Sequence, residues 1–258
     1  MDRSLAQEAR GLLASARALL DELVEEGFDA AAGPAAPQVA PAQPAPARPV
    51  PAAPAAADGR QLDLSGGDPL WPDEPSLDDV RGALGDCRRC RLCEARTQIV
   101  FGDGNPHADL MFIGEGPGQE EDRRGVPFVG RAGKLLTQMI EKGLKIPRSD
   151  VYICNIVKCR PPGNRTPLAD EAATCRPFLD GQIEAVRPRV LVALGRPATS
   201  LLLGRDVPIS KVRGQWHEYR GIPLMPTFHP AFVLRQYTAQ NRRLVWDDLV
   251  AALERSRS

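Results

Sequence analysis

Six thiols are the first side chains in this sequence that could do chemistry together. They are Cys87, Cys90, Cys93, Cys154, Cys159 and Cys175. The first three form a CxxCxxC pattern, and four thiolates in a reducing compartment can hold zinc or a [4Fe–4S] cluster. Spacing alone chooses neither the metal group nor which four of the six thiols bind it.

A glycine-rich turn is the second candidate site. The apolar run 110–113 predicts a buried strand, and the turn GEGPG at 114–118 follows it directly. Ligands of open α/β sheets bind where such loops leave the carboxyl ends of strands, and glycines let the backbone approach a flat ligand. The known phosphate-binding glycine motifs do not fit, and Pro117 lacks the N–H that a phosphate would need. A plain tight turn is the structural alternative.

Two polar residues follow other predicted strands. Asn155 lies near the end of a predicted strand at 151–157, and His229 opens a His-Pro loop after a predicted strand at 223–227. An amide offers both a donor and an acceptor, and a histidine can donate a hydrogen bond to developing charge. Taken singly, such residues are more often strand-end or packed residues without a chemical role.

The charge distribution divides the chain into two parts. Residues 1–75 carry a net charge of −7 and residues 76–258 carry +7. A basic folded part favours an anionic partner such as nucleic acid. No apolar run is long enough for a membrane span and no signal peptide is evident, so we expect a cytoplasmic protein.

Three segments are predicted from the sequence. Residues 1–27 form an amphipathic helix, which either docks on a partner protein or packs loosely on its own chain. Residues 28–75 form an Ala/Pro-rich disordered linker with eight prolines between Pro34 and Pro54. The folded domain spans residues 76–258, and Ser76 is expected to cap its first helix.

Short apolar strands alternate with helices in the predicted domain. The strand that contains the apolar run 110–113 is expected at 109–113, and a fourth strand is expected at 189–194. Helices are expected at 77–86, 131–143, 167–186, 196–203 and 241–254. Thr166 and Pro167 are expected to cap and open the third helix. Strands separated by helices predict an α/β fold, a three-layer α/β/α arrangement with a central, mostly parallel sheet.

The motifs together resemble family 4 uracil-DNA glycosylases, the iron–sulfur branch of the uracil-DNA glycosylase superfamily. The resemblance rests on GEGPGQEED with PFVGRAG, on CRRCRLCEARTQIVFGDGNP, on NIVKCRPPGNRTP with TCRPFL, and on LMPTFHPAFVLR. It covers about residues 77–250, and the motifs occur in the family's order. It implies the uracil-DNA glycosylase fold.

The resemblance also implies a metal group and its ligands. Cys87, Cys90, Cys159 and Cys175 would hold a [4Fe–4S] cluster, and Cys93 and Cys154 would be ordinary small residues. Four thiolates around a 2+ cluster carry a net charge of −2, which gives the neighbouring basic residues an electrostatic role. We expect the cluster to be structural.

The resemblance further implies a role for each pocket residue. The uracil ring would stack on Phe128 beside the Gly116 backbone, and Asn155 would distinguish uracil from cytosine. His229 would stabilise charge on the departing base. Glu115 would either orient or activate the attacking water, or help to hold the base through the adjoining Gly116 backbone. Two residues of the last motif would contact DNA, Phe232 as a wedge and Arg235 at a phosphate, although helix-start packing is the alternative for Phe232.

The function implied is hydrolysis of the N-glycosidic bond of uracil in DNA, in base excision repair, by a monomer. No lysine stands where the motifs would place an amine nucleophile, so we expect no strand-cleaving step. Related covalent uracil-binding proteins carry a basic insert after the cysteine that follows Asn155, and this sequence lacks it. Two other classes remain as alternatives: a non-catalytic nucleic-acid binder, and a nucleotide- or zinc-binding regulator.

Overall fold

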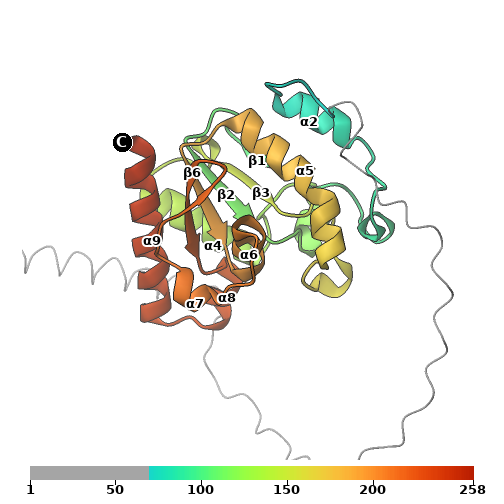
Figure 1. The fold of residues 1–258 in the computed structure, drawn as a ribbon. Coiled ribbons are helices and arrows are strands. Elements are labelled where there is room, and N and C mark those ends of the chain that lie inside the picture. The colour runs from blue at the N-terminus through green and yellow to red at the C-terminus, as the bar shows by residue number, and fades with distance from the viewer. Residues whose placement is uncertain (1–69) are drawn as a thin grey trace, which may run out of the picture. The chain divides into compact units, whose positions relative to one another are not determined.

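The computed structural model describes residues 70–258, shown in colour in Figure 1. The predictions for the helix at 1–27 and for most of the linker at 28–75 lie outside these residues. The strands are β1 (Asp103–Gly104), β2 (Leu110–Gly114), β3 (Tyr152–Asn155), β4 (Val190–Leu194), β5 (His217–Tyr219) and β6 (Ile222–Thr227). The α-helices are α2 (Leu77–Leu84), α3 (Gln119–Arg124), α4 (Arg131–Gln138), α5 (Ala169–Val186), α6 (Arg196–Leu203), α7 (Ile209–Val212), α8 (Pro230–Arg235) and α9 (Ala239–Arg257).

The strands form one sheet in the order β1-β3-β2-β4-β6-β5. The four central strands are parallel, and the short edge strands β1 and β5 are antiparallel to their neighbours. The two inner strands β2 and β4 are buried along their whole length, as expected for a sheet covered on both faces. The predicted mostly parallel sheet is confirmed, and only the two edge strands, too short for a period-two signal, were not predicted.

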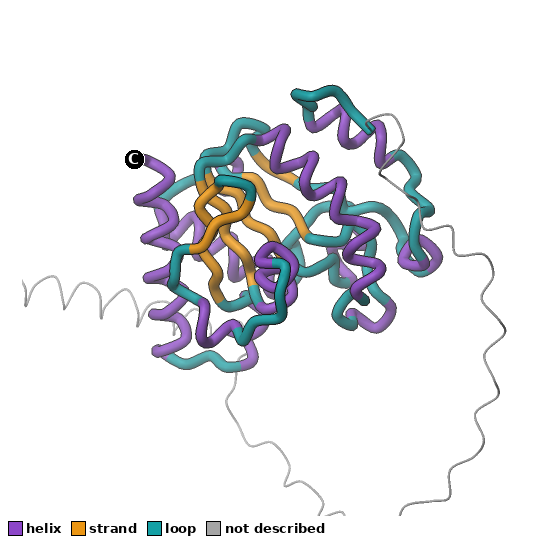
Figure 2. Tube along the Cα trace, in the orientation of Figure 1, coloured by secondary structure: helices purple, strands orange, loops and turns teal. Residues whose placement is uncertain are grey.

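Helices cover both faces of the sheet, so the predicted three-layer α/β/α architecture is confirmed (Figures 1 and 2). Alternate residues of β2 point into different cores. Met111 and Ile113 pack with residues of α5 and α6, while Leu110 and Phe112 pack with residues of α4 and α9. A smaller cluster joins α2 to α5 around Phe178, and Trp71 packs against that ring.

Element boundaries follow local hydrogen bonds. The Ser76 hydroxyl accepts from the Asp79 N–H at 3.2 Å, which confirms the predicted cap of α2. The predicted cap of α5 at Thr166 is wrong, because the helix begins at Ala169 with Leu168 at the N-cap position. There the Glu171 carboxylate accepts the Leu168 N–H at 2.8 Å and so replaces a Thr166 hydroxyl cap.

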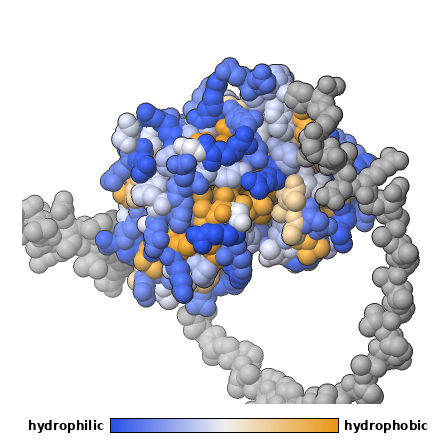
Figure 3. All heavy atoms as spheres, in the orientation of Figure 1, coloured by the Kyte–Doolittle hydropathy of each residue, from blue (hydrophilic) through white to orange (hydrophobic). Residues whose placement is uncertain are grey.

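The visible surface is mainly polar. Figure 3 shows apolar side chains gathered near the middle of this face, where Figure 1 places α6. Among the described residues, no helix combines the length and apolar character that a membrane crossing requires.

One buried carboxylate anchors α9 to the rest of the domain. Asp248 is 2% exposed and accepts hydrogen bonds from the Thr227 hydroxyl at 2.6 Å and from the Arg213 Nε at 2.9 Å. It thereby joins α9 to the end of β6 and to the residue after α7. Burial raises the pKa of Asp248, while its two partners lower it.

We expect Asp248→Ala to destabilise the fold by about 3 kcal/mol, because it leaves the half-buried Arg213 guanidinium without its partner. Chemical unfolding followed by circular dichroism measures the change. Asp247→Ala is the matched control, since Asp247 pairs with Arg243 at the exposed surface and its loss should cost less than about 1 kcal/mol. Equal effects of the two substitutions would contradict this account.

Candidate active site

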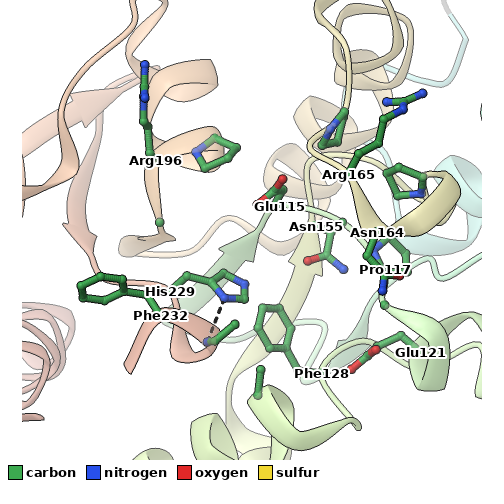
Figure 4. Close-up of a pocket in the computed structure, with 18 of the residues that line it drawn as sticks. Glu115, Pro117, Glu121, Phe128, Asn155, Asn164, Arg165, Arg196, His229 and Phe232 are labelled. Carbon is green, nitrogen blue, oxygen red and sulfur yellow. Dashed lines mark hydrogen bonds between the residues drawn. The ribbon is translucent and has the colours of Figure 1, made fainter. Parts of the chain in front are cut away.

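A pocket of about 530 Å³ lies where the parallel strands end at their carboxyl side. It is bordered by a glycine after β2 and another after β4, by an asparagine at the end of β3 and by a histidine after β6. The seven pocket and DNA-contact residues predicted from the motifs line it: Glu115, Gly116, Phe128, Asn155, His229, Phe232 and Arg235. Figure 4 shows Phe128, Asn155 and His229 converging on the same space.

Asn155 gives the strongest indication that the pocket binds a ligand. Its side chain is buried, with 1% of the residue exposed, yet neither its amide nitrogen nor its amide oxygen finds a hydrogen-bond partner among the described residues. A buried amide without partners costs about 1–3 kcal/mol, so native proteins rarely keep one without a function. The arrangement fits a ligand that offers one acceptor and one donor side by side.

Phe128 forms the wall next to this amide. Its backbone is in the left-handed region with φ of 53°, and a Cβ on Gly133 would overlap that backbone. The Glu121 carboxylate accepts the next two backbone N–H groups, those of Val129 at 2.9 Å and Gly130 at 2.8 Å. A strained conformation held this firmly is typical of a residue that must present a flat ring at a fixed angle.

His229 faces the Phe128 ring, with 5.6 Å between ring centroids. Its Nδ1 accepts the Ala231 N–H at 3.1 Å at the start of α8. Burial of the ring, aided by the charge of Arg235, lowers the pKa of His229 to about 4. The neutral ring therefore carries its proton on Nε2, which makes Nε2 a hydrogen-bond donor at neutral pH.

Glu115 and Gly116 border the pocket where β2 meets β3. The backbone here is drawn close to the next strand, because the Glu115 carbonyl accepts the Val157 N–H at 3.4 Å. A Cβ on Gly116 would lie 3.0 Å from a Val157 methyl group. The half-buried Glu115 carboxylate is left at the pocket wall (Figure 4).

Arginines surround the pocket mouth. Arg165 and Arg196 lie on opposite sides of it in Figure 4, paired with Glu171 and Asp206 respectively. Arg235 is exposed and forms no ion pair with any described residue. Phe232 packs on Phe228 with ring centroids 4.7 Å apart, the contact expected of the packing alternative, while it also borders the pocket.

The thiols gather at a second, smaller pocket between α2 and α5. Its lining includes all four predicted ligands and Cys93, together with apolar side chains such as Leu92 and Phe178. Cys154 does not line it and is fully buried in the sheet. None of the six thiols forms a disulfide.

The donors around these thiols favour anionic sulfur. The Arg96 Nη1 lies 3.3 Å from the Cys159 sulfur and the Arg89 Nη1 lies 3.4 Å from the Cys87 sulfur. Burial nevertheless raises the pKa of Cys159 to about 11 and that of Cys175 to about 12. No described group of three or more potential ligands is arranged around a point for a single ion.

Comparison with known proteins identifies the family. A model of the uracil DNA glycosylase superfamily matches residues 101–250. A type-4 uracil-DNA glycosylase of Thermotoga maritima is 46% identical over 186 residues, which are 71% of this chain and 96% of that protein. The type-4 enzymes of Sulfurisphaera tokodaii and Saccharolobus solfataricus are 44% and 43% identical over 181 residues, 67% of this chain and 81% and 83% of theirs. The chain belongs to the type-4 uracil-DNA glycosylase family.

The residues that hold this glycosylase pocket in shape were not predicted. Glu121 fixes the Phe128 loop, and Asp122 accepts the Thr97 N–H at 2.8 Å. Arg148 donates to the Pro127 carbonyl at 2.7 Å from the other side of that loop. The signal that could have found Glu121 is its position just before the glycine-rich segment GVPFVGRAG.

The state of His229 can be tested directly. We expect its ring to stay neutral from pH 8 down to about pH 5, since its pKa of about 4 lies far below the ordinary value. Proton titration by NMR measures this. The folded state binds a proton here less readily than the unfolded state, so the His229 contribution is complete above pH 6.5 and is lost as the pH falls toward 4. A midpoint above 6 would contradict the assignment.

Proposed function

We propose that the protein is a monofunctional uracil-DNA glycosylase, which hydrolyses the N-glycosidic bond of uracil in DNA and leaves an abasic site for base excision repair. Family membership and the activity for which its relatives are named support the reaction class. The observation that carries the proposal is the buried Asn155 amide, whose donor and acceptor are unpartnered beside the Phe128 ring.

Recognition begins with the base outside the helix. Flipping the nucleotide costs a few kcal/mol of stacking and pairing, which contact with Phe128 offsets. The Asn155 amide donates to the uracil O4 and accepts from N3–H. Cytosine presents a donor and an acceptor in the reverse order, so it would leave these buried groups unpaired at a cost of about 1–3 kcal/mol.

Bond cleavage places negative charge on the departing uracil, in large part on O2. His229 donates its Nε2–H to that oxygen, so the hydrogen bond strengthens as the bond breaks. Support for this donor comes from the Ala231 N–H at Nδ1, which fixes the tautomer, and from the lowered pKa, which keeps the ring neutral. The neutral imidazole stabilises the uracil anion by donating a hydrogen bond and does not transfer a proton to it.

The sugar carbon then takes up water. Glu115 at the pocket wall accepts a proton from this water and orients its oxygen toward the sugar. The exposed Arg235 binds a phosphate of the strand, and Phe232 fills the space from which the base departs.

A [4Fe–4S] cluster held by Cys87, Cys90, Cys159 and Cys175 completes the proposed enzyme. The four-thiol donor set, the buried surroundings and the arginine donors to two of the sulfurs support it. When bound, the cluster supplies no electrons to the reaction and ties together chain segments that are distant in sequence.

The activity can be tested with an oligonucleotide that contains one uracil. Strand breakage should follow only after alkali treatment, because the enzyme leaves an intact strand with an abasic site. Asn155→Ala and His229→Ala should each lower the single-turnover rate by at least about 100-fold, the scale of one lost transition-state donor. Melting temperatures of the variants serve as the folding control.

Two results would contradict the proposal. Breakage without alkali would indicate a lyase step. Covalent or non-covalent retention of the uracil oligonucleotide, without any cleavage, would indicate a binding protein on the glycosylase fold.

The ligand assignment can be tested by substituting single thiols. Cys175→Ser should lower the iron content and the visible absorbance of the purified protein, because serine is a poor ligand for the cluster. Cys93→Ser is the matched control, since Cys93 borders the same pocket and should leave both unchanged. Iron lost equally from both variants would contradict the assignment, and zinc in place of iron in the unaltered protein would contradict the cluster itself.

A further inference from the structure

Lys158 lies between the thiol pocket and the uracil pocket and takes no direct part in the proposed reaction. It is 1% exposed and is among the largest fully buried side chains of the described domain. Its Nζ donates to the Asn155 carbonyl at 2.7 Å and to the Gln182 Oε1 at 2.5 Å. On its other side it borders the small pocket together with Cys159 and Cys175.

Among the described residues, the Lys158 ammonium donates only to neutral oxygens. Within residues 70–258 no carboxylate lies within ion-pair distance of its ammonium. A buried ammonium without a counter-charge is strongly unfavourable, so proteins rarely keep one unless an anion is bound beside it. The two arginines at the thiols differ in this respect, because Arg96 pairs with Asp86 and Arg89 is exposed to solvent.

We infer that Lys158 is the buried counter-charge of the thiolate site and that, through its hydrogen bond to the Asn155 carbonyl, it positions the amide that recognises uracil. This inference rests on the proposed function. Four thiolates around a 2+ cluster would carry −2, and Lys158 borders the thiol pocket while its ammonium bonds the carbonyl of Asn155, which lines the larger pocket. The Lys158 side chain therefore acts on both the cluster and the base-recognition residue Asn155.

The geometry around Asn155 makes such coupling direct. Lys158 follows Asn155 by three residues, and its ammonium closes that turn on the carbonyl at the end of β3. Gln182 holds the ammonium from α5, and its own amide is fixed by the Phe101 carbonyl at 2.9 Å and the Tyr152 hydroxyl at 3.1 Å. The Asn155 side-chain amide has no hydrogen-bond partner among the described residues. Its orientation therefore depends on the position of the Asn155 backbone.

The test is a double-mutant cycle with Lys158→Met and Asn155→Ala in the full chain. Two quantities are measured: the rate at which a chelator removes iron, and the single-turnover rate of uracil excision per iron-loaded chain. We expect Lys158→Met to lose iron about tenfold faster and to excise uracil about tenfold more slowly, because small misplacements of a recognition group reduce rates on this scale. In the Asn155→Ala background, Lys158→Met should not slow excision further.

Matched variants separate charge from packing. Gln182→Leu alters a neighbour at the same depth but keeps the ammonium, so its rate of iron loss should stay within about twofold of the unaltered protein. Lys158→Gln replaces Lys158→Met if the latter does not fold, since it also removes the charge and keeps an N–H.

Either of two results would overturn the inference. One is unchanged iron loss in the uncharged variant, and the other is an equal slowing of excision in the presence and absence of the Asn155 side chain. An unaltered protein without iron or without excision would overturn the proposed function as well. Iron and excision in the unaltered protein, with no effect at Lys158, would overturn this inference alone.

Discussion

The uracil pocket depends on the close approach of Phe128 and Asn155 above Gly114. A Cβ at Gly114 would overlap the Asn155 Oδ1 and lie 2.5 Å from the tip of the Phe128 ring. The last residue of β2 must therefore lack a side chain for a ring from one loop and an amide from the next strand to meet. Because both groups meet over a strand end that the sheet holds rigid, the pocket is formed before any ligand arrives.

Such preformation has a cost that the surrounding structure offsets. An unpartnered buried amide and a phenylalanine at positive φ each disfavour the folded state by about 1–3 kcal/mol. The Glu121 carboxylate and the Arg148 guanidinium hold the Phe128 loop through charge-assisted hydrogen bonds, which are stronger than neutral ones. The strain is thus confined to Asn155 and Phe128, the two groups that would contact the base in the proposed reaction and would give specificity against cytosine.

The sequence predicts the central strands and the larger helices because their apolar periodicity is set by burial. It does not predict β1 or β5, which are too short to carry a pattern, nor the start of α5, where the Glu171 carboxylate displaces the expected Thr166 cap. The candidate site follows from motifs, since a family motif fixes residue identity and order. The contacts of Glu121 and Arg148 with the Phe128 loop and of Lys158 with Gln182 depend on how separate segments fold against one another, which the local sequence does not specify.

Support for the pocket also comes from the thiol-bearing segment. The buried Asp122 of α3 accepts the Thr97 N–H, which fixes the chain just after the first three cysteines. The preceding residue on α3, Glu121, holds the Phe128 loop through two backbone N–H groups. One short helix therefore links the cysteine segment to the stacking ring, while β3 and the turn after it link Cys159 to the Asn155 amide. A group that holds the thiols together would restrain both walls of the uracil pocket, which gives a structural cluster a reason to persist in an enzyme whose reaction uses no electrons.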